Sequence, residues 1–387
     1  MDYRKFAGST PRMLVLHSRY WLDEACARAA QTLDWQVRTA PVALEGVMPR
    51  EKVAQLLETI VEFCPDFMLA VNLSGMDEDG VLTRLFEDLC LPYAVWFVDA
   101  PRTIIMGRPV YASAYTAAFT WDEAYCPYLA SCGFPLVKKL PLAVDPSLFN
   151  AGPPSSWQHP PSFVGNSMTE PARYELDWIN GIPKLDRAVR AALDAGRVTR
   201  ERFGQALDAI LDPTLVATLS PHERRHAEMA LFTEGTRRLR ESFVRALEPE
   251  GVQVCGDEHW RGICPRAAGP LNYEHDLPAF YRACEINLNI TSIQMPTAVN
   301  QRVFDCPAAG GFLLTDAQPA LNALFESGEM VSYNSLDECK DLLGWYRAHP
   351  EARGAIVKKA RSRILAQHTY AHRLQQIEKT LREFLDE

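Results

Sequence analysis

The residues best placed to do chemistry lie between two short apolar segments, Ile286–Ile290 and Phe312–Thr315. Asn300, Gln301 and Arg302 come between these segments, at the expected start of a helix. Amide side chains donate hydrogen bonds, the guanidinium carries positive charge, and the free N–H groups of a helix start attract anions. A strand–loop–helix–strand unit with such residues predicts a pocket for the phosphates of a nucleotide.

Arg302 is given a specific role in this pocket, and three further residues, Gly165, Asn166 and Gly256, are assigned to it. Arg302 is the candidate for neutralising a diphosphate, with an ion pair to a neighbouring acid as its alternative role. Gly165 and Asn166 follow a predicted strand at Ser162–Val164, where a glycine lets the backbone approach a phosphate. A glycine in a tight turn is the equally common explanation. Gly256, which follows Cys255, is assigned in the same way to the border of a nucleobase.

A second group of polar residues follows predicted strands in the first third of the chain. Ligands bind beyond the carboxyl ends of parallel strands, so these residues are expected to line a second site. Asp99 is the candidate catalytic or acceptor-orienting carboxylate, and forming the turn before Ala100–Pro101 is its alternative role. His17 is a further candidate at the end of the first predicted strand, where a lone histidine is more often structural. The group consists of His17, Asn72, Ser74, Gly75, Asp99 and Arg102.

The sequence His222-Glu223-Arg224-Arg225-His226 matches the His-Glu-x-x-His pattern of zinc proteases. The context favours a helix start instead, because Ser220, Pro221 and Glu223 are the residues of a capping box. No third zinc ligand is identifiable, and no dependable Asp-x-Asp metal motif is present. The sequence therefore predicts no metal site.

Alternating strands and helices are expected to position the candidates of the first third. This alternation predicts a parallel sheet with helices on both faces, hence an α/β fold. The expected strands are Met13–His17, Gln36–Pro41, Phe67–Asn72 and Tyr93–Val98, and the helices are Asp23–Leu33, Arg50–Phe63 and Val81–Leu89.

A segment rich in Pro, Gly and Ser at 150–161 indicates a boundary between two domains. We expect a first domain at 1–150, a linker at 151–161 and a second domain at 162–370. Residues 173–247 carry no strong strand signal, so they are expected to form a helical insertion in the second domain.

Composition narrows the class of protein. The 387 residues are 47% hydrophobic and 23% charged, which is ordinary for a soluble protein of about two domains. The net charge is −9 and no long Lys/Arg run occurs, so no nucleic-acid partner is expected. Without a signal peptide or an apolar run of ~20 residues, we expect a cytoplasmic protein with no transmembrane segment. The ten scattered cysteines are expected to be reduced thiols.

Several segments together resemble one family. They are PDFMLAVNLSGMDEDG (65–80), LPYAVWFVDAPR (91–102), LPLAVDPSLF (140–149), VNQRVFDCPAAGGFLLTD (299–316) and AQHTYAHRLQQIE (366–378). The chain resembles the CgeB-like glycosyltransferases, named after the spore maturation protein, over most of its length outside roughly 170–250. The resemblance implies a GT-B fold, in which two Rossmann-like domains face each other across a cleft. It also implies that the final helix, at 371–387, packs back on the first domain.

The resemblance further implies a reaction and its substrates. The second domain would hold a nucleotide-diphosphate sugar, with UDP favoured over GDP or dTDP, and no permanently bound cofactor. The first domain would hold a protein or cell-envelope glycan acceptor. Asp305 would bind the donor ribose, whereas Thr297 stands where many related enzymes carry a second acid. That departure keeps a non-catalytic GT-B module, binding a glycan, a nucleotide or a partner enzyme, as the alternative; a GT-B epimerase is a third option.

Overall fold

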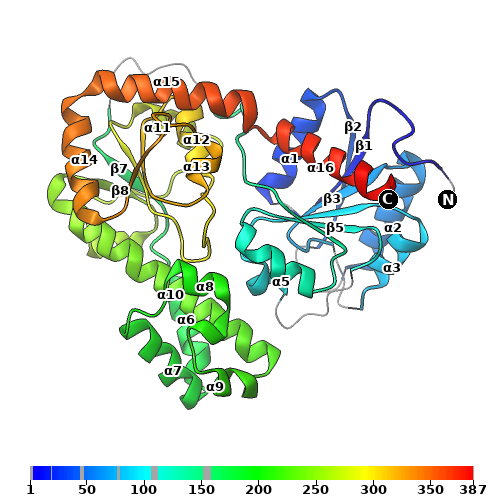
Figure 1. The fold of residues 1–387 in the computed structure, drawn as a ribbon, viewed down its shortest axis with the longest axis horizontal. Coiled ribbons are helices and arrows are strands. Elements are labelled where there is room, and N and C mark those ends of the chain that lie inside the picture. Colours follow the sequence, from blue (N-terminus) through cyan, green and yellow to red (C-terminus); the bar gives the residue numbers. More distant parts are fainter. Residues whose placement is uncertain are drawn as a thin grey trace. The chain divides into compact units, whose positions relative to one another are not determined.

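A computed structural model describes residues 3–18, 20–43, 48–75, 79–105, 112–150 and 158–386. The chain divides into two compact units, each built on a parallel sheet covered by helices (Figure 1). Unit 1 comprises Met1–Pro141 and Tyr370–Glu387, and unit 2 comprises Leu142–Thr369. The predicted α/β class is confirmed. Of the expected linker at 151–161, residues 151–157 lie outside the described part of the chain.

The sheet of unit 1 has the strand order β2-β1-β3-β4-β5-β6, and its described pairings are all parallel. The order reverses between β1 and β3, which makes their carboxyl ends the place where a ligand is expected. The strands are β1 (Arg12–His17), β2 (Gln36–Pro41), β3 (Phe67–Val71), β4 (Tyr93–Phe97), β5 (Thr116–Thr120) and β6 (Leu136–Lys139).

Helices bury both faces of this sheet. Every residue of β3, β4 and β5 is buried, which explains their continuous apolar runs. The terminal helix α16 packs on α1, and its Tyr370 ring lies against Trp21 and Trp96. The helices are α1 (Trp21–Thr32), α2 (Arg50–Phe63), α3 (Val81–Asp88), α4 (Pro101–Ile105), α5 (Cys126–Ser131) and α16 (Tyr370–Asp386).

The sheet of unit 2 has the strand order β11-β10-β9-β7-β8, again with parallel pairings. Its order reverses between β7 and β9. The strands are β7 (Ser162–Val164), β8 (Gln253–Cys255), β9 (Asn287–Asn289), β10 (Leu313–Asp316) and β11 (Val331–Tyr333).

The region expected as a helical insertion contains helices α6 to α10. The 27-residue helix α10 packs along α6 and then reaches the sheet, where Phe243 contacts Phe163 and Tyr333. These helices are α6 (Thr169–Asn180), α7 (Pro183–Asp194), α8 (Arg200–Gln205), α9 (Pro213–Thr218) and α10 (Pro221–Leu247). The others in unit 2 are α11 (Leu277–Ala283), α12 (Arg302–Ala308), α13 (Leu321–Leu324), α14 (Leu336–Ala348) and α15 (Pro350–Gln367).

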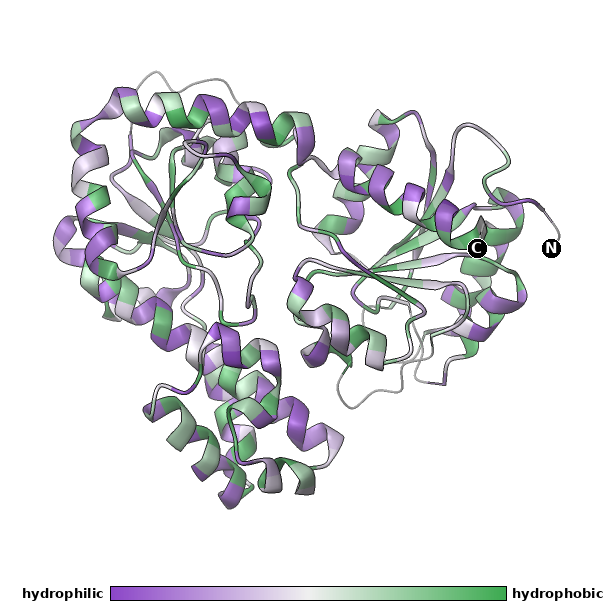
Figure 2. Cartoon of the chain, viewed as in Figure 1, coloured by the Kyte–Doolittle hydropathy of each residue, from purple (hydrophilic) through white to green (hydrophobic). Residues whose placement is uncertain are grey.

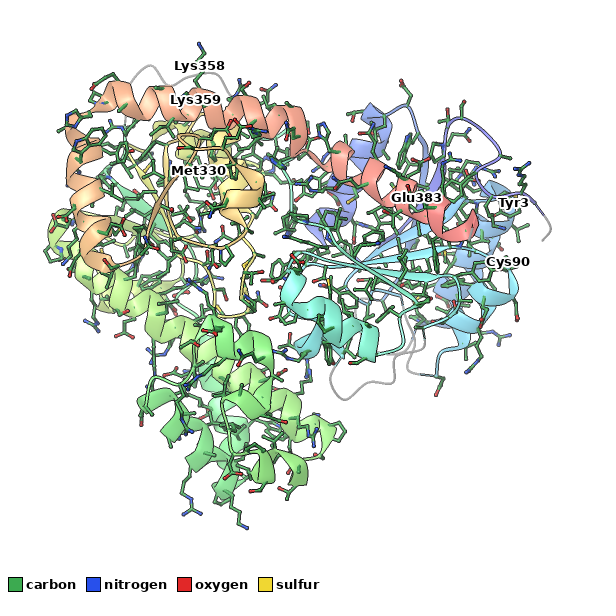
Figure 3. All side chains as sticks on the ribbon, in the orientation of Figure 1. Tyr3, Cys90, Met330, Lys358, Lys359 and Glu383 are labelled. Atoms are coloured by element: carbon green, nitrogen blue, oxygen red, sulfur yellow. The ribbon has the colours of Figure 1, made fainter. Side chains whose placement is uncertain are left out.

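Hydropathy follows burial in both units. Figure 2 shows the central strands of unit 1 mainly in hydrophobic colours, whereas the helices alternate between the two classes. All ten cysteines are free, and six are buried. Cys90 is the exposed one and lies at the edge of unit 1 in Figure 3, whereas Lys358 projects outward from α15.

Candidate functional site

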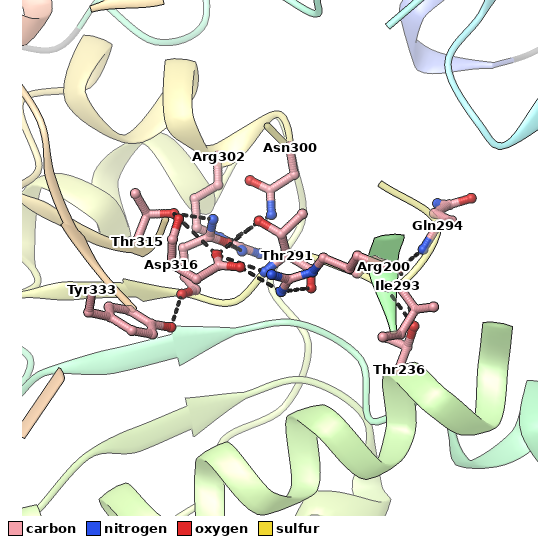
Figure 4. Close-up of polar contacts among 12 residues, drawn as sticks. Arg200, Thr236, Thr291, Ile293, Gln294, Asn300, Arg302, Thr315, Asp316 and Tyr333 are labelled. Carbon is pink, nitrogen blue, oxygen red and sulfur yellow. Dashed lines mark hydrogen bonds and ion pairs between the residues drawn. The ribbon is translucent and has the colours of Figure 1, made fainter. Parts of the chain in front are cut away.

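Arg302 lies where the strand order of unit 2 reverses. Its guanidinium donates hydrogen bonds to the Oδ1 of Asn289, at the end of β9, and to the carbonyl of Val164, at the end of β7. The group also lies 5.6 Å from the centroid of the Phe163 ring. Its Nε is buried and has no hydrogen-bond partner. The cation is therefore fixed at the expected ligand position with donor capacity remaining (Figure 4).

Asn300 points to the same place. Its Nδ2 donates to the Oδ1 of Asn289 over 2.8 Å, while its own Oδ1 is buried without a partner. Gln301 turns the other way and donates to the carbonyl of Ala143 and to Asp305. The structure thus brings Asn300 and Arg302 together and directs Gln301 into the protein.

A second arginine, which the sequence reasoning missed, lies beside Arg302. Arg240 of α10 donates to the carbonyl of Asn166 over 2.7 Å, and its Nε is buried without a partner. Burial, followed by the charge of Arg302, lowers the pKa of Arg240 to about 10, with Asp257 acting in the opposite direction. Within the described ranges, neither arginine forms an ion pair with a carboxylate. Two neighbouring cations without a paired anion form a site suited to a diphosphate.

Close packing between the loops that follow β7 and β8 explains the glycine at position 256. A Cβ on Gly256 would lie 2.3 Å from the carbonyl oxygen of Gly165 and 2.8 Å from the Nε1 of Trp260. That indole donates to the same Gly165 carbonyl over 2.7 Å. Close approach of the two loops therefore requires a glycine at 256, and the nucleobase border assigned to it stays a prediction.

Asp305 is enclosed within unit 2. It is 1% exposed, and its two oxygens accept hydrogen bonds from the Tyr273 hydroxyl at 2.8 Å and the Gln301 amide at 2.9 Å. Burial raises its pKa to about 8, against the hydrogen bonds and the charge of Arg302. The Asp305 side chain thus bonds to other residues of unit 2. The ribose role that the resemblance implies stays a prediction.

This environment gives a pH-dependent stability. A carboxyl group with a raised folded-state pKa stabilises the fold below its unfolded value and loses that contribution as pH rises toward 8. The wild-type free energy of unfolding should fall by about 1 kcal/mol per pH unit between pH 5 and 8. Asp305→Asn keeps the acceptor for Gln301, and the Tyr273 hydroxyl can rotate to accept from the amide. We expect the variant to lack this slope when Tm is measured at pH 5 and 8, and parallel slopes would contradict the argument.

In unit 1, Asp99 lies just beyond the end of β4. It accepts a hydrogen bond from the Nδ2 of Asn72 at 3.2 Å and another from the Tyr20 hydroxyl. The Oδ1 of Asn72 in turn accepts from the backbone N–H of Val98 at 3.1 Å. Burial and the Asp99 charge raise the pKa of Tyr20. Asp99 is therefore held by Asn72, which follows β3, and by Tyr20, which precedes α1.

His17 belongs to the same edge of the sheet. Its Nδ1 lies 3.6 Å from the Oδ2 of Asp23, which also accepts hydrogen bonds from the backbone N–H groups of Ser18 and Tyr20. Burial raises the pKa of Asp23. The structure thus connects three predicted residues, His17, Asn72 and Asp99, through Tyr20 and Asp23, which the sequence reasoning missed.

The other three acceptor-side candidates have structural contacts. The Ser74 carbonyl accepts a hydrogen bond from the Tyr93 hydroxyl at 3.1 Å. Gly75 has a φ of +80° and close neighbours in Leu16 and Val42, so only glycine fits without strain. Arg102 is 4% exposed and lies 5.3 Å from the Tyr125 ring. A role in acceptor binding stays a prediction for these three residues.

The His-Glu-x-x-His segment has a structural explanation. Ser220 and Glu223 form the predicted capping box at the start of α10, which is confirmed. The Nδ1 of His226 lies 2.6 Å from the Oε2 of Glu175, and its ring stacks on Trp178 at 3.8 Å. Among the described residues, no group of three or more His, Cys, Asp or Glu side chains could hold a metal ion.

The buried pair of His226 and Glu175 should be important for stability. These residues are 4% and 6% exposed, so His226→Ala leaves a buried carboxylate without its partner. We expect a loss of about 3–5 kcal/mol in urea unfolding. His222→Ala, at an exposed position on the same helix, is the matched control and should cost under about 1 kcal/mol. Equal losses, or stoichiometric zinc that disappears in both variants, would support the zinc-site interpretation instead.

Comparison with known protein families finds a similarity in the C-terminal part of the chain. Residues 237–379 match the model of a family described as "Glycosyl transferase-like". This part of the chain is therefore similar to glycosyltransferases. It contains Arg240, Asn300, Arg302 and all strands of the unit 2 sheet except β7. The search of curated proteins finds no match.

Solved structures show the fold of the whole chain. Sucrose-phosphate synthase from Thermosynechococcus elongatus has a TM-score of 0.55 at 10% identity, with 97% of this chain and 99% of that chain covered. A glycosyltransferase from Rickettsia africae ESF-5 has a TM-score of 0.54 at 9% identity, covering 98% and 99%. Anabaena Alr3699/HepE, in complex with UDP and glucose, has a TM-score of 0.52 at 13% identity, covering 96% and 100%. The chain has the GT-B fold. None of its described helices has the length and apolar character needed to cross a bilayer.

Proposed function

We propose that the protein is a metal-independent glycosyltransferase that moves a sugar from a nucleotide-diphosphate sugar to a protein or cell-envelope glycan. The observation that carries this proposal is the convergence of Arg240 and Arg302 at the carboxyl end of β7, in the glycosyltransferase-like unit. Keeping two guanidinium groups close together without a paired carboxylate is unfavourable unless an anion joins them. A nucleoside diphosphate supplies that anion.

The chemistry of the donor side follows from these charges. Breaking the bond between sugar and diphosphate leaves negative charge on the departing nucleotide. Guanidinium groups already fixed at that position stabilise this charge without reorganisation. Because two cations are present in the chain itself, metal independence is part of the proposal. UDP is the proposed nucleotide, supported by the structurally similar Anabaena protein, whose described complex contains UDP and glucose.

The acceptor side is proposed to lie in unit 1. Asp99, held by Asn72 and Tyr20, would orient or deprotonate the acceptor hydroxyl, with His17 beside it. A positioned carboxylate that takes up the proton of an attacking hydroxyl acts as a general base, which accelerates such reactions. The CgeB-like subtype and a cytoplasmic site of reaction complete the proposal.

Binding and turnover measured on the wild-type protein test this function. Calorimetry with UDP, GDP and dTDP establishes whether a nucleotide binds, and release of UDP from UDP-glucose, UDP-galactose and UDP-N-acetylglucosamine establishes turnover. Nucleotide binding together with release of UDP would support the proposal. Binding without release on any donor, with and without a glycan acceptor panel, would favour the non-catalytic GT-B module. Absence of binding by all three nucleotides would overturn the proposed site.

A further inference from the structure

The loop between β9 and α12, residues 290–301, is held at its start by an ion pair that spans two elements. Asp316, at the end of β10, accepts hydrogen bonds from the N–H and the hydroxyl of Thr291, both at 2.9 Å. Arg200, the first residue of α8, donates to the Thr291 carbonyl at 2.6 Å and lies 2.5 Å from the Oδ2 of Asp316. Thr291 is therefore held through its N–H, hydroxyl and carbonyl together (Figure 4).

The helices of the 173–247 region hold the next residues of the same loop. Thr236 of α10 contacts the Ser292 hydroxyl at 3.2 Å and accepts from the backbone N–H of Ile293 at 3.2 Å. A Cβ on the adjacent Gly235 would lie 2.9 Å from the side chain of Val198 and 3.4 Å from that of Ile293. The tight contact with Val198 favours glycine at that position, and Ile293 of the loop lies at van der Waals distance from it.

Hydrogen bonds connect Arg200 to the proposed anion site, which is formed by Arg240, Asn300 and Arg302. Asn289 donates to the Thr315 hydroxyl at 2.8 Å, and that hydroxyl lies 3.4 Å from the Oδ1 of Asp316. The Oδ1 of Asn289 accepts from both Arg302 and Asn300. A continuous polar chain therefore runs from Arg200 through Asp316, Thr315 and Asn289 to Arg302.

We propose that Arg200 is a positioning residue for the nucleotide donor, acting through Asp316 and the 290–301 loop on Asn300 and Arg302. The helical region would then have a defined purpose, which is to hold the donor-binding loop in one geometry before the nucleotide arrives. Preorganised donors bind an anion more tightly because less ordering remains to be done on binding. The inference rests on the proposed function, since it concerns the same anion site.

The test compares Arg200→Gln with Arg202→Gln, a matched control at an exposed position of the same helix. We expect roughly tenfold weaker UDP binding by calorimetry for Arg200→Gln and unchanged binding for Arg202→Gln. Hydrogen exchange at Thr291 and Ile293 should become faster in Arg200→Gln. Arg200→Lys, which cannot serve both partners equally, should give an intermediate affinity.

A double-mutant cycle separates positioning from general loss of stability. If Arg200 acts only through the site of Arg302, Arg200→Gln should have little further effect in an Arg302→Gln background. Asp316→Asn, which keeps an oxygen acceptor for Thr291, provides an independent variant should Arg200→Gln not fold, and it should weaken UDP binding in the same way. Additive effects, or the same affinity for Arg200→Gln and Arg202→Gln, would overturn the inference while leaving the proposed function intact. Absence of UDP binding by the wild type would instead count against the proposed function.

Discussion

Asp99→Asn should lower sugar transfer by roughly 10²–10⁴-fold while leaving UDP affinity unchanged. The asparagine keeps the size of the side chain and one oxygen acceptor, which the Asn72 amide or the Tyr20 hydroxyl can still use. It removes the negative charge that would take up the acceptor proton or stabilise its departure. Because that contribution is made in the transition state, its loss appears in turnover and not in ground-state binding.

Transfer kinetics and UDP calorimetry on the same preparation decide this prediction. Asp34→Asn is the matched control, because Asp34 is an exposed aspartate of unit 1 at a positive φ, where asparagine is well tolerated. It should change neither quantity. Full transfer activity in Asp99→Asn would leave Asp99 with only its turn-forming role. Weaker UDP binding would place Asp99 on the donor side, contrary to the proposed division between the units.

The main elements of unit 1 could be predicted from sequence because its pattern is locally determined. The observed bounds of β2 and α2 equal the predicted ones, Gln36–Pro41 and Arg50–Phe63. By contrast, β11 (Val331–Tyr333) was not predicted, since three residues give too short a pattern to distinguish a strand from a loop. The short helix α4 (Pro101–Ile105) was missed for the same reason.

The candidate sites were only partly predictable because they depend on contacts between distant segments. Asn300 and Arg302 were found from the signal of a helix start. Arg240 lies on another helix, and nothing in its local sequence indicates that it reaches the carbonyl of Asn166. Polar residues inside an apolar strand were an available signal, since Asn289 interrupts the run that ends at Ile290 and connects to Arg302. The motif that contains Asp305 did not reveal that this side chain is buried.

The second large effect concerns the arginine pair. Arg302→Met and Arg240→Met should each weaken UDP binding by about 1.5–3 kcal/mol, or roughly 10- to 150-fold, through loss of a charge-assisted hydrogen bond to the diphosphate. Calorimetry with UDP measures this directly. Uridine, which lacks the diphosphate, should bind the variants and the wild type equally. Equal losses for UDP and uridine would show that the arginines support the fold of the site and do not contact phosphate.

Arg240→Met should not lower the stability of the fold, although it should weaken UDP binding. Its lowered pKa reflects burial next to another cation, so the charged form is disfavoured in the folded protein without a ligand. Replacing it with methionine removes that penalty at the cost of one hydrogen bond to Asn166, and we expect Tm to stay the same or rise. Arg238→Met is the matched control on the same helix, because Arg238 pairs with Glu234 and Asp194. It should lower Tm slightly and leave UDP affinity unchanged. An unchanged or higher Tm together with weaker UDP binding would show that Arg240 serves the diphosphate site at a cost in stability. A strong fall in Tm for Arg240→Met would mean that this arginine serves the fold.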